Sequence, residues 1–83
     1  MNTMFLLMAE FETTTILLSD VSEKYLGMRP STADKKAILG ELPFPTFRVG
    51  VGQKSPRVIH INDLAEYIDL KRKEAKEELL RIK

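Results

Sequence analysis

The chain has 83 residues, enough for one domain (1–83) with a thin core, and it contains no cysteine and one histidine. These counts exclude a disulfide framework, a thiolate metal site and a zinc site built from histidines, and we expect no metal and no cofactor. The net charge of +1 hides an uneven distribution of charge along the chain. Residues 29–60 contain six basic and two acidic residues, whereas residues 1–28 contain one basic and four acidic residues. Positive charge confined to one segment is typical of a surface that faces phosphate.

The N-terminal residues 3–11 are apolar on nearly every side, and their periodicity fits a helix and a strand equally well. Their methionine, leucine, alanine and glutamate content favours a helix, with Asn2 or Thr3 as its cap. The run is far shorter than the ~20 residues of a membrane helix and lacks the basic start of a secretory signal, so we expect a cytoplasmic, nucleoid-associated protein. Residues 13–18 are β-branched and apolar, which predicts a short strand.

Two short helices joined by a tight turn are predicted next. The first begins at Ser19 or Asp20, either of which suits an N-cap, and ends at Gly27, where a left-handed conformation is easily adopted. The second begins at Ser31 or Thr32 and ends before a glycine and a proline. Two alanines one turn apart in this helix leave room for the two helices to approach closely.

A proline-rich connector, 42–45, leads into a predicted β-hairpin. Residues 46–51 alternate in polarity, with Phe47, Val49 and Val51 expected on one face, and residues 52–56 and 57–61 supply the loop and the return strand. A last helix capped by Asn62 then runs to the end of the chain with an apolar stripe along it. At ~30 Å it is longer than a small core requires, so its distal half is a candidate dimerisation arm.

This element order predicts a mainly α fold with a small antiparallel hairpin, namely a winged helix-turn-helix with an extended C-terminal helix. The second short helix would enter a major groove of duplex DNA, and the hairpin, as the wing, would contact the adjacent backbone. Lysine contacts phosphate more readily than it reads bases, so we expect little direct base readout from this helix. The predicted DNA-binding residues are Arg29, Ser31, Thr32, Lys35, Lys36, Arg48, Gln53, Lys54 and Arg57.

We do not expect an enzyme. Gly50 and Gly52 lie in the predicted hairpin, outside the strand-to-helix setting of a phosphate-binding loop, and no nucleophile–base set has motif context. The basic residues also have a purely structural interpretation, since charged side chains protect sheet edges and cover solvated helix faces. A small protein-interaction module, such as an antirepressor or adaptor, is therefore an alternative.

Several segments resemble the pyocin activator family. They are Met1–Ala9, Asp20-Val21 with Tyr25–Met28, Leu42–Arg48, Gln53–Pro56 with His60, and Asp63–Asp69. The resemblance covers the whole chain and implies a transcriptional activator that binds short promoter repeats and switches on bacteriocin or prophage genes.

The layout also resembles winged helices of the excisionase and AlpA type, which have an excisionase/MerR-like DNA-binding fold. This resemblance implies an architectural, DNA-bending role as a second alternative. One module covers only ~600–1,000 Å², so useful specificity requires a homodimer or adjacent copies on repeated sites. Activation further implies a contact with RNA polymerase.

Overall fold

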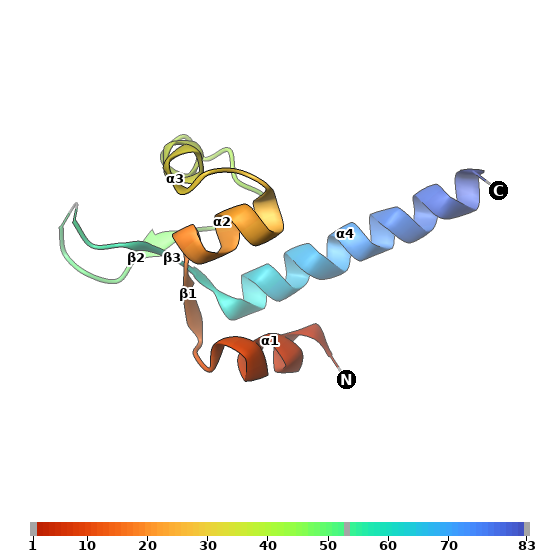
Figure 1. Ribbon diagram of the computed structural model, residues 1–83, viewed down its shortest axis with the longest axis horizontal. Coiled ribbons are helices and arrows are strands. Elements are labelled where there is room, and N and C mark those ends of the chain that lie inside the picture. The colour runs from red at the N-terminus through yellow and green to blue at the C-terminus, as the bar shows by residue number, and fades with distance from the viewer. Residues whose placement is uncertain (1, 53, 83) are drawn as a thin grey trace.

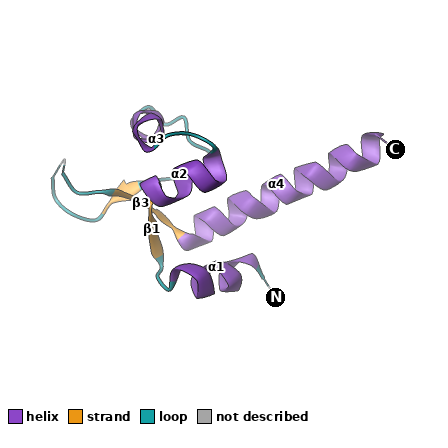
Figure 2. Ribbon diagram, in the orientation of Figure 1, coloured by secondary structure: helices purple, strands orange, loops and turns teal. Residues whose placement is uncertain are grey.

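The computed structural model of the chain describes residues 2–52 and 54–82. Over that part, four helices and a small three-stranded antiparallel sheet make up the fold (Figure 1; Figure 2). The elements are α1 (Thr3–Phe11), β1 (Thr15–Leu17), α2 (Leu18–Leu26), α3 (Pro30–Ile38), β2 (Phe47–Arg48), β3 (Arg57–His60) and α4 (Ile61–Ile82). The prediction of a mainly helical fold with a small hairpin and a long C-terminal helix is confirmed.

The ambiguous N-terminal segment is a helix. The side chain of Asn2 caps α1 by accepting a hydrogen bond from the Phe5 N–H at 2.9 Å. α1 lies against α4, where Leu7 joins the buried core and the Thr3 hydroxyl donates to the Asp69 carboxylate. The helix is therefore fixed by a local cap at its start and by one buried leucine.

The sheet has β3 as its central strand, with β1 and β2 on either side. Ile16 of β1 lies opposite Ile59 of β3, and both side chains are buried. β1 was expected as a strand, but only the tertiary structure supplies its partner, which lies more than forty positions along the chain. Because β3 leads directly into α4, this pairing ties the N-terminal half of the protein to its C-terminal helix.

The hairpin strand β2 is shorter than expected, and the prediction that it continues to Val51 is wrong. It contains two residues, and Val49 and Val51 lie beyond it in the loop and are exposed to solvent. The Gly50 N–H donates to the Ser55 hydroxyl at 3.1 Å, so its donor is used within the loop and not in a strand ladder. Glycine weakens strands, and the two glycines of this stretch end the pairing early.

The two short helices start one or two residues earlier than the capping residues suggested. α2 begins at Leu18, not at Ser19 or Asp20, and within the described residues no side chain caps it; Leu18 is buried, so packing fixes the start. α3 begins at Pro30, because the fixed φ of proline suits the first helical position. Gly27 ends α2 at φ +67°, as expected for a left-handed cap.

α2 and α3 pack closely through small side chains. Ala33 of α3 is fully buried, as are Val21 and Ser22 of α2. The C-terminal end of α3 is closed by Gly40 at φ +71° and by a hydrogen bond of 2.8 Å from the Glu41 N–H to the Lys36 carbonyl. The orientation of α3 is thus set by its inner face, which leaves the outer face exposed.

The first turns of the long helix α4 belong to the core, and the rest of the helix projects from it. Its first turns bury Ile61, Leu64 and Ala65, whereas residues 69–82 are all exposed and extend away from the body (Figure 1). The predicted cap at Asn62 is wrong: the His60 Nδ1 accepts a hydrogen bond from the Asn62 N–H at 3.0 Å. Across residues 2–52 and 54–82 the structure contains no helix with the length and apolar character to span a membrane.

Candidate nucleic-acid interface

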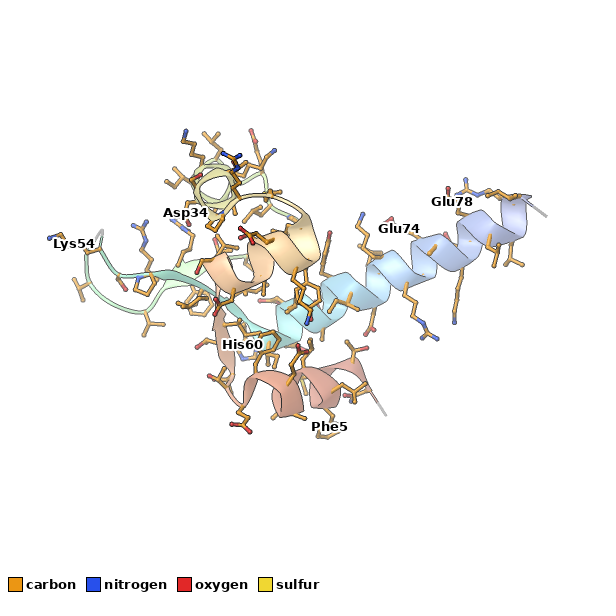
Figure 3. All side chains as sticks on the ribbon, viewed as in Figure 1. Phe5, Asp34, Lys54, His60, Glu74 and Glu78 are labelled. Carbon is orange, nitrogen blue, oxygen red and sulfur yellow. The ribbon has the colours of Figure 1, made fainter. Side chains whose placement is uncertain are left out.

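α3 and the described parts of the loop between β2 and β3 (49–52 and 54–56) lie toward the same end of the molecule's long axis, and the C-terminal end of α4 lies at the other end (Figure 1). Asp34 of α3 and Lys54 of the loop mark the two elements in Figure 3. The basic segment 29–60 carries a net charge of +4, and both elements belong to it. The fold therefore gathers much of the positive charge at one end.

The outer face of α3 is opposite the alanines that pack on α2. Ser31, Lys35 and Leu39, spaced four residues apart, follow this face and are exposed, and Thr32 is exposed beside them. Lys36 lies closer to the body, is half-buried, and has its Nζ 3.9 Å from the Glu41 carboxylate. The two adjacent lysines therefore differ, because Lys35 points outward and Lys36 is partly engaged within the protein.

The N-terminus of α3 presents backbone donors near an exposed cation. Arg29 occupies the N-cap position and is exposed, and in the described part of the chain no side chain caps the helix. Ser31 and Thr32 follow in the first turn, where helical N–H groups have no partner within the helix. A helix start of this kind favours an anion, through its dipole and its N–H groups.

The hairpin supplies the remaining predicted cations, in two different environments. Arg48 and Lys54 are exposed, and Lys54 projects from the loop (Figure 3). Arg57 is half-buried, with one Nη donating to the Thr46 hydroxyl at 3.1 Å and a buried Nε that has no hydrogen-bond partner among the described residues. Gln53 lies outside the described residues.

Two arginines face each other across the hairpin. Arg48 of β2 is the direct cross-strand partner of Arg57 of β3. Like charges directly opposite each other destabilise a strand pair. An anion bound beside them would relieve that repulsion, so the pair is better suited to a phosphate-facing surface than to an isolated hairpin.

Two apolar residues at the end of α3 were not among the predicted site residues. Ile38 and its neighbour Leu39 are 67% and 69% exposed. The predicted DNA-binding residues are all polar or charged, whereas the signal for Ile38 and Leu39 is a large aliphatic side chain at the helical spacing of the outer face.

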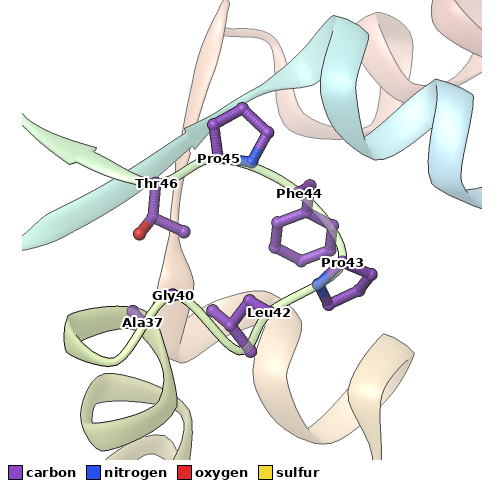
Figure 4. Close-up of a pocket in the computed structure, with 7 residues that line it drawn as sticks. All are labelled: Ala37, Gly40, Leu42, Pro43, Phe44, Pro45 and Thr46. Atoms are coloured by element: carbon purple, nitrogen blue, oxygen red, sulfur yellow. The ribbon is translucent and has the colours of Figure 1, made fainter.

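A surface pocket lies between the end of α3 and the connector 42–45 (Figure 4). Its volume is about 440 Å³, and Thr46 is the one polar side chain among its lining residues. Phe44 lies in this connector and packs edge-on against Tyr67 of α4, with ring centroids 5.4 Å apart. The pocket has no ionisable group in its lining, and we assign it a structural role in joining α3 to the hairpin.

The titratable groups of residues 2–52 and 54–82 give no second candidate site. Over the described residues no cluster of three or more histidine, aspartate or glutamate side chains is placed to hold a metal ion. Lys24 of α2 donates to Glu10 of α1 at 2.7 Å, and this hydrogen bond raises the pKa of the exposed lysine. That pair links two helices on the surface, away from α3.

The family model described as "Pyocin activator protein PrtN" matches residues 3–75 of the chain. Neither the curated proteins nor the solved structures contain a match. The matched span includes α1, the sheet, α2, α3 and the first part of α4.

Proposed function

The chain belongs to the pyocin activator family, which suggests a transcriptional activator of pyocin genes, and on this premise we propose that it acts by binding duplex DNA. α2, the turn and α3 act as a helix-turn-helix, and the β2–β3 hairpin acts as a wing. α3 enters the major groove, and the wing contacts the backbone beside it. The protein works by binding and not by catalysis, on promoter repeats of bacteriocin or prophage genes in the bacterial nucleoid.

The observation that carries this proposal is the exposed outer face of α3, with Lys35 at its centre. Ala33 is fully buried on the opposite side, so the helix is held firmly while Lys35 remains free to approach a phosphate. The exposed Lys54 lies toward the same end of the molecule (Figure 3). Together with Arg29 and Arg48 they supply four exposed cations for backbone contacts.

Binding to repeats requires more than one copy, and we propose a homodimer or adjacent copies. The apolar stripe of α4 continues past the core at Ala75, Leu79 and Ile82, all of them exposed. This spacing of three and four residues is the pattern by which helices pair. The outer side of α1, where Phe5 and Leu6 are more than half exposed, is a second apolar surface. It is suited to contact a second copy of the chain or RNA polymerase.

A gel shift with duplexes from upstream of the chain's neighbouring genes, followed by footprinting, tests the proposal. We expect a retarded complex at low salt and protection of short repeats. Duplexes of scrambled sequence serve as the control and should bind more weakly. No retardation of any duplex would contradict DNA binding and would favour the protein-interaction alternative.

One observation favours the architectural alternative. Val49 and Val51 are exposed on the wing, and apolar side chains inserted between base steps kink DNA. Circular-permutation gel shifts separate the two functions: a sharp bend at the site without stimulation of transcription in vitro would support bending. Stimulation of transcription would support activation.

A further inference from the structure

The outer face of α3 contains few of the side chains that read bases through paired hydrogen bonds. Arginine, asparagine and glutamine are absent from α3, and the lysine of this face, which can also pair with guanine, contacts phosphate more readily. The exposed residues from its first turn to its C-cap are Ser31, Thr32, Asp34, Lys35, Ile38 and Leu39. Hydrogen bonding from this face is therefore a weak source of sequence discrimination.

Ile38 and Leu39 are the largest apolar groups on that face. They are 67% and 69% exposed, and neither packs against the core. Both follow Lys35 by one helical turn, so the surface that carries the outward cation also carries the aliphatic side chains. A duplex that approaches Lys35 meets them directly.

The major groove offers one apolar group to such side chains, the C5 methyl of thymine. From Ser31 to Leu39 the helix rises ~12 Å, which matches the width of the groove and the length of three to four base pairs. Because Ile38 and Leu39 lie ~4.5–6 Å along the axis from Lys35, the thymines would fall within about two base pairs of its phosphate contact.

We propose that Ile38 and Leu39 are specificity-determining residues that read thymine methyl groups in the major groove. The inference rests on the proposed function, since it requires α3 to enter a duplex. The neighbouring charge favours this occupant over an apolar protein partner: Lys35 is exposed one helical turn from the two residues, and segment 29–60 has a net charge of +4.

Replacing thymine by deoxyuridine tests the inference, because the change removes the C5 methyl and keeps base pairing. A bound duplex is first selected from a random pool with the wild-type chain. It is then synthesised with deoxyuridine at each thymine in turn, and affinities are measured by fluorescence anisotropy for the wild type, Ile38→Ala, Leu39→Ala and Leu80→Ala. Leu80 is an exposed leucine on distal α4 and serves as the matched control.

For the wild type we expect each contacted thymine to lose about threefold to fourfold in affinity when its methyl is removed, the equivalent of one buried methylene. Ile38→Ala or Leu39→Ala should bind the thymine duplex more weakly than the wild type does. Each variant should lose no further affinity when deoxyuridine replaces the thymine that the mutated side chain contacts. Leu80→Ala should behave as the wild type.

Wild-type binding that is unchanged by every deoxyuridine substitution would overturn this inference and leave DNA binding intact. Full methyl sensitivity in both Ile38→Ala and Leu39→Ala would overturn it as well, since another residue would then read the methyl groups. Failure to select any bound duplex would overturn the proposed function and this inference together.

Discussion

The two adjacent lysines of α3 should contribute unequally to DNA binding. Lys35 is exposed at the centre of the outer face, whereas Lys36 is half-buried and has its Nζ 3.9 Å from the Glu41 carboxylate. A lysine that already faces a carboxylate gains less from a phosphate. Lys35→Ala should therefore reduce the salt dependence of binding, and Lys36→Ala should reduce it by a smaller amount.

The magnitude follows from the number of exposed cations. With Arg29, Lys35, Arg48 and Lys54 each neutralising one phosphate, log affinity against log salt has a slope of about −3.6. Raising salt fourfold then weakens wild-type binding about 150-fold, and weakens Lys35→Ala binding only about 40-fold, at a slope of about −2.7. Lys36 is not among the four counted cations, so Lys36→Ala should stay close to the wild-type value.

Fluorescence anisotropy titrations at a series of salt concentrations measure these slopes, with melting curves to show that each variant is folded. Lys76→Ala, on the exposed distal part of α4, is the matched control and should keep the wild-type slope. An unchanged slope for Lys35→Ala would show that Lys35 does not contact a phosphate. A larger change for Lys36→Ala than for Lys35→Ala would show that the outward face of α3 has been misassigned.

Three further pairs of variants test the fold and the proposed assembly. Gly27→Ala should lower the melting temperature by several degrees, because Gly27 has a φ of +67° and an alanine in the left-handed conformation costs about 1–2 kcal/mol. Gly52→Ala should leave the melting temperature unchanged, because Gly52 does not have a positive φ and no atom beyond its chain neighbours lies within 4 Å of the added Cβ. His60→Ala should cost about 1 kcal/mol in denaturant unfolding because α4 loses its cap, and His60→Asn should restore most of it; equal stabilities would rule out the capping role. Leu79→Glu, on the apolar stripe of α4, should weaken self-association measured by sedimentation velocity. Leu80→Glu, about 100° around the same helix, should leave self-association unchanged. Equal effects of the two variants would exclude the distal half of α4 as a specific dimerisation arm.

Features with local causes could be predicted from the sequence. Gly27 ends α2 in the left-handed conformation, and Asn2 caps α1, because each outcome depends on residue type and a few neighbours. The long C-terminal helix follows from its own periodicity. The exposed positions of Ser31, Thr32 and Lys35 likewise follow once the alanines of α3 define its inner face.

Features set by contacts distant in sequence could not be predicted. α2 begins at Leu18 because that side chain is buried, and burial is decided by the whole core. The half-buried state of Arg57 depends on its hydrogen bond to Thr46 across the hairpin. The cap of α4 is a histidine, a residue type that capping preferences do not select, so the sequence pattern predicted a cap at Asn62 instead.

The most direct measurement of the central claim is an NMR titration of the ¹⁵N-labelled chain with a bound duplex. We predict that the amide shifts of α3, from Ser31 to Ile38, and of the β2–β3 hairpin change together on binding. The outer surface of α1 should change far less. Changes confined to α1 and distal α4, with α3 unaffected, would contradict the account.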